Sequence, residues 1–214
     1  MALPSGENIN FSRYPAKGRD LLLWFASERG LAPTEIQAAR DLAAKGTEVW
    51  QFDLTAAFFL PQTHSSMDKI SVKDMQAILD RVRKSGKRLT VYAANRAAVP
   101  VLRALAGQHR QRTKVMLMHP HFYSRVDTLD GADYLSFGNL KGVDALILQP
   151  RRSAATPWVN DQLASLRKDG ARVKLLMLEN VREGFWVRES ATEFEIVEGG
   201  RLAELIIEWR KKLK

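Results

Sequence analysis

The sequence predicts a three-layer α/β/α sandwich whose central sheet is mainly parallel, has about seven strands and carries an antiparallel strand at one edge. Short apolar runs alternate along the chain with segments of helical period, which is the pattern of repeated strand and helix units. Several of these runs are apolar throughout, as expected for strands covered on both faces. In the middle of the chain a strand, a group of very small residues and a helix follow one another directly, which predicts a tight elbow.

Two side-chain patterns distinguish the expected strands. Residues 8–14 alternate apolar and polar side chains, which predicts a half-exposed edge strand. Residues 20–26 are almost continuously apolar, which predicts a buried strand. Further apolar runs predict the remaining strands at residues 47–54, from residue 89 onward, and at residues 114–118, 143–148 and 173–178.

The expected helices follow from apolar residues at helical spacing. Thr34 is expected to cap the first helix, which ends at Gly46. Ser71 and Asp74 resemble a capping box at the start of the second. The last three helices are expected to bury Val101, Leu102, Leu105 and Ala106; Val159, Leu163 and Leu166; and Leu202, Leu205, Ile206, Trp209 and Leu213.

Two long segments, residues 56–70 and 122–141, show no clear period and are expected to be irregular. Both are too apolar for free linkers, so we expect them to pack over the sheet edge or the elbow. Aromatic side chains in these segments, together with Phe185 and Trp186, are expected to close the top of the fold. The alternative is that they line an apolar ligand site or a partner surface.

Composition narrows the class of protein. A chain of 214 residues with 45% apolar content is long enough for a single domain spanning residues 1–214. It has no cysteine, which excludes disulfides, thiolate metal ligands and a cysteine nucleophile. The net charge of +9 is scattered and lacks interleaved aromatic residues, so we expect no nucleic-acid partner. No apolar run reaches 18 residues, so we expect no membrane span.

The start of the chain bears on localisation. Residues 1–14 lack the charged start and apolar core of a signal peptide. The cytoplasm is therefore favoured, with an exported form that has lost its leader left open.

The predicted elbow is centred on Asn95. In a G-x-S-x-G elbow, small neighbours let the strand and the helix pass closely and the central side chain projects at the carboxyl end of the sheet. Here the five residues are Ala93-Ala94-Asn95-Arg96-Ala97. The small residues are kept, and an asparagine stands where the nucleophile would be.

From about Asn8 to Trp209, the order of these parts resembles the α/β-hydrolase fold. The family places an acid after the strand that here ends at Leu148, where this chain has Pro150-Arg151-Arg152-Ser153. It places a histidine after the strand that here ends at Leu178, where this chain has Arg182-Glu183-Gly184-Phe185. All three members of the Ser-His-Asp triad are replaced. The resemblance therefore implies the scaffold without its usual chemistry.

An amide at residue 95 is not a useful nucleophile, and Arg182 cannot act as a base near neutral pH. We therefore expect a non-catalytic binding or interaction protein with a degenerate active site. The alternative is a non-standard ester or thioester hydrolase that uses His119 or His121 with a loop serine such as Ser153, or with an activated water. Whether the protein is an enzyme stays open at this point.

His119 and His121 directly follow a predicted strand, at the sheet end where ligands bind in such folds. At this spacing in an extended segment their side chains point in opposite directions, so a shared metal ion would need a turn at Pro120. No acidic motif accompanies them. We therefore expect no metal ion and no cofactor.

Five arginines fall just beyond strand ends and form the predicted rim of the site. If they converge, they would bind a small carboxylate or phosphate ligand. In the alternative, nearby carboxylates pair with these arginines and close the site. The expected partner is therefore either a small anionic ligand or a protein, and the oligomeric state is not determined. The ligand-binding candidates are Ser27, Arg29, Asn95, Arg96, Arg151, Arg152 and Arg182, and the acidic candidates are Glu28, Asp53, Glu179 and Glu183.

Overall fold

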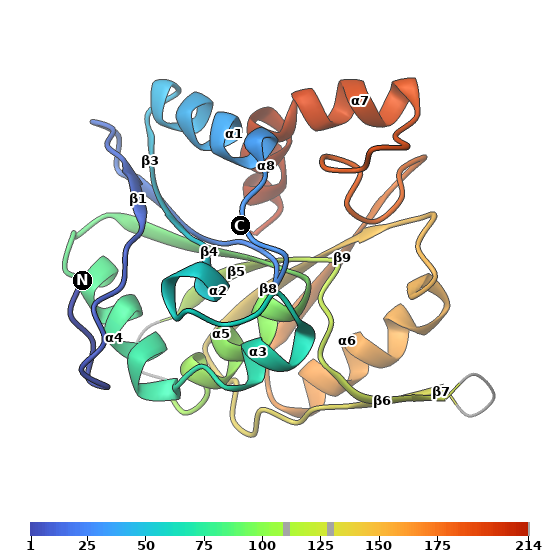
Figure 1. The fold of residues 1–214 in the computed structure, drawn as a ribbon. Coiled ribbons are helices and arrows are strands. Elements are labelled where there is room, and N and C mark those ends of the chain that lie inside the picture. The colour runs from blue at the N-terminus through green and yellow to red at the C-terminus, as the bar shows by residue number, and fades with distance from the viewer. Residues whose placement is uncertain (109–111, 128–130, 214) are drawn as a thin grey trace.

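The computed structural model describes residues 1–108, 112–127 and 131–213 and places a seven-stranded sheet between two layers of helices (Figure 1). The strand order is β1-β3-β2-β4-β5-β8-β9. β1 pairs antiparallel with β3, and all other neighbours in this sheet pair in parallel. The strands are β1 (Ser12–Tyr14), β2 (Asp20–Phe25), β3 (Thr47–Phe52), β4 (Arg88–Ala94), β5 (Thr113–Met118), β8 (Val143–Pro150) and β9 (Arg172–Leu178). The predicted mixed sheet with an antiparallel edge strand is confirmed.

Apolar side chains on successive strand residues enter two different cores. In β2, Leu22 and Trp24 point to one face, and Leu21, Leu23 and Phe25 point to the other. All five are fully buried, which explains why the run is apolar throughout. Helices α1 (Pro33–Ala44) and α8 (Leu202–Lys212) cover the first face, and α4 (Val72–Arg83), α5 (Ala98–Leu105) and α6 (Val159–Lys168) cover the second.

The first helix begins two residues earlier than expected. α1 starts at Pro33, and Ala32 rather than Thr34 occupies the cap position. The side chain of Glu35 accepts a hydrogen bond of 2.9 Å from the backbone N–H of Ala32. The hydroxyl of Thr34 instead donates to the carbonyl of Trp186 at 2.8 Å. The prediction of a Thr34 cap is therefore wrong, because a tertiary contact engages that hydroxyl.

The capping box expected at the start of α4 is also absent. Ser71 stands at the cap position, but its side chain makes no cap hydrogen bond. Asp74 instead accepts a hydrogen bond of 3.0 Å from the backbone N–H of Ser5. The carboxylate thus fastens the N-terminal segment to α4 rather than closing the helix end.

The two segments expected to be irregular contain regular structure. The first includes the short helices α2 (Leu54–Ala57) and α3 (His64–Asp68), and the second includes the antiparallel hairpin of β6 (Tyr123–Asp127) and β7 (Gly131–Tyr134). One-turn helices are too short to show a period, which is why the sequence pattern misses them. The pattern also does not reveal α7 (Glu193–Gly200). No helix among the described residues is long and apolar enough to cross a membrane.

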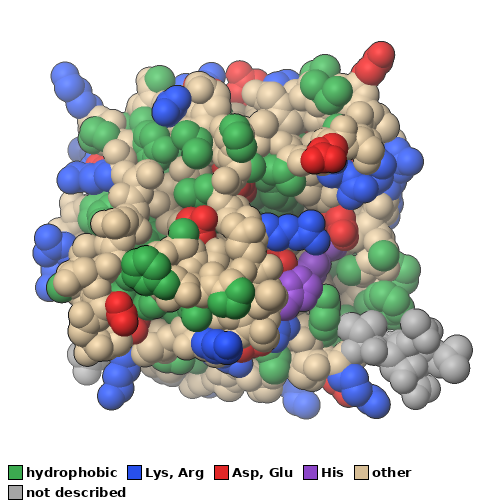
Figure 2. Space-filling view, viewed as in Figure 1, with side chains coloured by type: hydrophobic (Ala, Val, Ile, Leu, Met, Phe, Trp, Pro, Cys, Tyr) green, Lys and Arg blue, Asp and Glu red, His purple; other side chains and the backbone are tan. Residues whose placement is uncertain are grey.

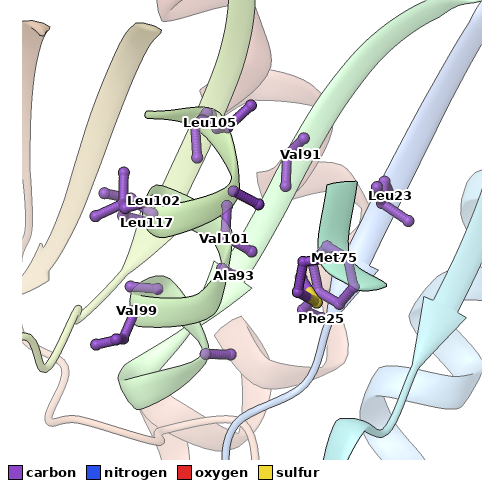
Figure 3. Packing of buried hydrophobic residues seen from close by; sticks show 14 of the residues in the cluster. Leu23, Phe25, Met75, Val91, Ala93, Val99, Val101, Leu102, Leu105 and Leu117 are labelled. Carbon is purple, nitrogen blue, oxygen red and sulfur yellow. The ribbon is translucent and has the colours of Figure 1, made fainter. Parts of the chain in front are cut away.

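The elbow at the end of β4 is confirmed. β4 ends at Ala94, a single turn of tight helix spans Asn95–Ala97, and α5 follows directly. Three alanines, Ala93, Ala94 and Ala97, are fully buried at this turn. Because their side chains are small, β4 and α5 can approach each other closely. Figure 3 shows the apolar side chains of β4 and α5 facing one another beside Leu117 of β5. This packing fixes the elbow at the carboxyl end of the sheet.

Candidate functional site

Asn95 has a backbone φ of 48°, in the left-handed region. Asparagine adopts this conformation more readily than most residues, because its short polar side chain can bond locally. The carbonyl of Asn95 accepts a hydrogen bond of 3.1 Å from the backbone N–H of His121. The elbow residue therefore has a positive φ, and this hydrogen bond ties it to the segment after β5.

Glu28 covers the backbone N–H that follows the elbow residue. In G-x-S-x-G elbows this N–H helps to form the oxyanion hole. Here the N–H of Arg96 donates to Glu28 Oε2 at 3.1 Å, and Glu28 is almost fully buried in the loop after β2. A carboxylate of the protein itself thus occupies the position of a bound oxyanion.

The second oxygen of Glu28 faces a histidine from another segment. Glu28 Oε1 lies 2.8 Å from Nε2 of His64, the first residue of α3. The ring of His64 lies edge-on to the ring of His121, with 5.5 Å between the centroids. Glu28 therefore connects the elbow N–H to His64, whose ring packs against His121.

His119 and His121 face each other, contrary to the expectation from their spacing. His119 has a φ of 45°, which breaks the extended conformation that would have pointed the rings apart. His119 Nδ1 lies 3.0 Å from His121 Nε2. The left-handed conformation of His119 therefore supplies the change of direction that a shared site would otherwise need at Pro120.

Ser153, which follows β8, contacts the other nitrogen of His119. Its Oγ lies 2.6 Å from His119 Nε2, donates a hydrogen bond of 3.2 Å to Glu183 Oε2, and accepts one of 3.2 Å from the N–H of Ala155. Glu183 Oε2 also lies 3.4 Å from His119 Nε2. A serine and an imidazole are therefore in contact beside the elbow. The His/Glu cluster comprises Glu28, His64, His119, His121, Ser153 and Glu183.

Figure 2 shows histidine side chains of this cluster reaching the surface between acidic and basic side chains. Burial lowers the pKa of His119 from 6.5 to about 4. Burial, and then the neighbouring His119, also lower the pKa of His121 to about 4, although Glu28 and Glu183 oppose this shift. Both imidazoles are thus neutral at pH 7 and have a nitrogen lone pair available.

Arg96 does not present a free charge to the cleft. Its guanidinium binds both oxygens of Asp68 at 2.8 and 2.9 Å and donates to the carbonyl of Tyr123 at 2.7 Å. Arg96 is nearly buried, and Asp68 is the last residue of α3. This pair therefore holds α3, and His64 with it, against the elbow.

The other rim arginines divide into paired and exposed side chains. Arg151 pairs with Glu179 at 2.7 Å, as the closed-site alternative expected. Arg182 pairs with Glu195, a buried acid outside the predicted set, at 2.5 Å. Arg29 and Arg152 are exposed.

The remaining polar candidates serve the local backbone. Ser27 Oγ accepts a hydrogen bond of 3.2 Å from the N–H of Arg29 within its own turn. Asp53 caps α2 through the N–H of Ala56.

Sequence reasoning placed His119, His121 and Ser153 at this end of the sheet but missed the roles of Glu28, His64 and Glu183. The two acids were expected to pair with arginines, and His64 lay in a segment without a recognised element. The available signal was weak: imidazole and carboxylate residues follow several predicted strands, whose carboxyl ends share one edge.

Comparison with known proteins supports the scaffold. No protein-family model and no curated protein matches the sequence. A putative dienelactone hydrolase from Klebsiella pneumoniae subsp. pneumoniae MGH 78578 is 15% identical, with a TM-score of 0.64 over 98% of this chain and 95% of that chain. Esterase Est22 is 10% identical, with a TM-score of 0.71 over 98% of this chain and 79% of that chain.

Est1E from Butyrivibrio proteoclasticus, solved with ferulic acid bound, is 11% identical, with a TM-score of 0.60 over 96% of this chain and 97% of that chain. These neighbours are α/β-hydrolase fold proteins. This protein accordingly has the α/β-hydrolase fold. At such low identity the likeness concerns the fold alone.

Proposed function

We propose that the protein is a hydrolase of the ester or thioester type whose reactive serine lies beyond β8 instead of at the elbow. The observation that carries this proposal is the 2.6 Å contact between Ser153 Oγ and His119 Nε2. A hydroxyl at this distance from a neutral imidazole has the geometry of a nucleophile and its general base. The structural neighbours described as esterases and a dienelactone hydrolase share this scaffold, which adds support.

Each group has a defined role in the proposed reaction. Ser153 Oγ attacks the acyl carbonyl while its proton passes to His119 Nε2. His121, 3.0 Å from His119 Nδ1, orients the ring, and the carboxylate of Glu183 stabilises the imidazolium that forms. His119 then returns the proton to the leaving alcohol or thiol, and water releases the acyl group from Ser153 by the same route.

The basicity of His119 limits the rate that this arrangement can reach. General-base catalysis is most efficient when the pKa of the base lies near the working pH. Burial holds the pKa of His119 at about 4, so the imidazole is neutral at pH 7 but weakly basic. We therefore expect slow turnover of activated esters.

The test is a panel of p-nitrophenyl esters with short acyl chains, assayed at pH 7 to 8 with the wild type and single variants. We expect Ser153→Ala to reduce turnover to the background rate, and His119→Ala to reduce kcat by at least about 100-fold, the lower end of what a general base contributes. Ser65→Ala is the matched control, because Ser65 is an exposed serine whose hydroxyl contacts Thr63. Turnover that survives Ser153→Ala would refute the proposed nucleophile.

A second candidate is a non-catalytic binding protein, and the position of Glu28 favours it. The carboxylate satisfies the N–H of Arg96, so the elbow offers no free oxyanion donor at that atom. Ser153 Oγ also serves a local turn through Ala155 N–H, which is a common structural role of loop serines. Background rates with every ester, in a protein that unfolds cooperatively, would support this candidate.

A further inference from the structure

Three side chains of the His/Glu cluster form a compact set of possible metal ligands. The proposed serine chemistry uses only one of them, His121. Glu28, His64 and His121 each offer one ligand atom, and these atoms all lie within 4.8 Å of one another. The closest pair, Glu28 Oε1 and His64 Nε2, is separated by 2.8 Å. Two donors bound to one tetrahedral zinc ion at about 2.0 Å lie roughly 3.3 Å apart, so small side-chain rotations would suffice.

We propose that Glu28, His64 and His121 bind one divalent transition-metal ion of the Zn²⁺ type. Two imidazoles and one carboxylate are a donor set that zinc prefers, and three protein ligands leave a position open for water or substrate. Mg²⁺ and Ca²⁺ prefer oxygen ligands and fit this set poorly. The 2.8 Å contact between Glu28 Oε1 and His64 Nε2 keeps two of the ligands together.

The three ligands are held by contacts that do not involve the ion. Glu28 is oriented by the N–H of Arg96, which engages the oxygen that does not face His64. His64 is carried by α3, which the pair of Arg96 with Asp68 fastens to the elbow. The backbone of His121 donates to the carbonyl of Asn95. Such outer contacts preorganise ligands and raise affinity.

His121 has a ring nitrogen that is available to bind an ion. Its Nδ1 is buried and, in the described part of the chain, has no hydrogen-bond partner. A buried polar atom without a partner costs free energy, and an ion bound to that atom would recover this cost. His64 is 48% exposed, so the side of the site away from Glu28 opens to solvent. An exchangeable water or a substrate oxygen could therefore reach the ion.

A second set of donors, His119, His121 and Glu183, competes for the assignment. His119 is 2% exposed, and its Nε2 is already in contact with Ser153 at 2.6 Å. Its Nδ1 is occupied by His121. Both nitrogens of His119 thus have partners, whereas His64 keeps an exposed ring, which favours the set that contains Glu28 and His64.

The role of the ion, unlike its binding, rests on the proposed hydrolase function. Glu28 covers the Arg96 N–H that would otherwise stabilise an oxyanion. A divalent cation bound to Glu28 would provide positive charge beside this position and polarise the substrate carbonyl.

The experiment uses the full chain, stripped with EDTA and dialysed, and titrated with Zn²⁺ by calorimetry. We expect one Zn²⁺ per chain, a rise in melting temperature with Zn²⁺, and no comparable rise with Mg²⁺. Co²⁺ should give the absorption of a four-coordinate nitrogen and oxygen site. We expect His64→Ala and Glu28→Gln each to weaken Zn²⁺ binding by more than about 100-fold, the upper end of what outer-sphere partners contribute.

The controls separate loss of binding from loss of folding. His64 is exposed, and the glutamine in Glu28→Gln still accepts the Arg96 hydrogen bond, so both variants should keep the wild-type circular dichroism spectrum. Glu183→Gln is the matched control and should bind Zn²⁺ like the wild type. Absence of stoichiometric Zn²⁺ binding, or a loss in Glu183→Gln equal to that in Glu28→Gln, would overturn the proposal.

Turnover distinguishes this inference from the hydrolase proposal. Stoichiometric Zn²⁺ binding without ester hydrolysis would uphold the metal site and refute the proposed function. Suppose instead that the chain does not bind Zn²⁺ and that ester hydrolysis needs Ser153 but is unchanged by EDTA or Zn²⁺. This result would uphold the proposed function and refute the metal site.

Discussion

Glu35 is an acid whose environment opposes its charge. It lies in the first turn of α1 and is 3% exposed. Burial raises its pKa from 4.5 to about 7, although hydrogen bonds from Ala32 and Trp186 partly offset this effect. At neutral pH the folded protein thus carries a carboxyl group that is protonated in about half of the molecules.

This shift predicts a stability change between pH 4.5 and about 7. In that range the unfolded chain has lost the Glu35 proton while the folded protein keeps it, so the contribution of Glu35 to the free energy of unfolding falls as the pH rises. The full effect is roughly 3 kcal/mol. Urea unfolding of the wild type and of Glu35→Gln should show that the wild type loses stability relative to the variant across this range. A constant difference would contradict the buried, raised pKa.

Asn95 combines a left-handed backbone with a position at the elbow. We expect Asn95→Gly to change the free energy of unfolding by less than about 1 kcal/mol, because glycine has no Cβ to oppose a positive φ. Asn95→Val should lower it by more than about 2 kcal/mol, because a β-branched residue is a severe outlier in this region. Equal urea midpoints for the two variants would show that the turn is not left-handed.

At the scale of elements, one ion pair joins the elbow to α3. Arg96 is 7% exposed and binds Asp68 with two hydrogen bonds. The two residues belong to segments that the sequence pattern did not connect, since α3 lies in a stretch expected to be irregular. The position of His64 in the His/Glu cluster depends on this connection.

We expect Arg96→Met to lower the free energy of unfolding by about 1 to 3 kcal/mol, because it removes the charge-assisted hydrogen bonds of a nearly buried guanidinium to Asp68 and to the carbonyl of Tyr123. Arg151→Met is the control, since Arg151 and Glu179 form an exposed pair and such pairs contribute little to stability. Chemical unfolding of both variants measures the contrast. A cost for Arg96→Met no larger than that of the control would contradict the anchoring role.

At the scale of the whole molecule, the two ends of the sheet have different electrostatics. The carboxyl end carries the His/Glu cluster. At the opposite end, Asp144 of β8 binds Arg112 beside β5 and Arg172 of β9, each through two hydrogen bonds. These hydrogen bonds, first from Arg112 and then from Arg172, hold the pKa of Asp144 well below its ordinary value of 3.8. Three neighbouring strands are thereby joined away from the site.

This arrangement predicts how acid weakens the fold. The lowered pKa of Asp144 contributes stability that is complete above the unfolded pKa of 3.8 and is lost as the pH falls below it. Asp144→Asn should therefore be less stable than the wild type at pH 6, and the gap between their urea midpoints should shrink as the pH falls below about 4. A gap that is independent of pH would refute the role of the charge. Zinc binding should be unaffected, because Asp144 lies at the other end of the sheet.

How much of the fold follows from the sequence can be judged from particular elements. The buried strands were located well because covering both faces demands unbroken apolar runs such as that of β2. Short elements were missed, since α3 and the hairpin of β6 and β7 depend on packing against the body of the protein for their conformation. Of the candidate site, Ser153, His119 and His121 were named, but their mutual contacts were not.

By itself, the sequence determined the alternation of strands and helices and the elbow at Asn95, because local spacing of apolar and small residues is enough to specify both. Only the tertiary structure decided which polar groups meet. Glu28 reaches His64, and His119 reaches Ser153, because loops from separate strands end at one edge of the sheet and His119 adopts a positive φ. No spacing along the chain carries such information, since contacts between distant loops depend on strand order and on single backbone angles.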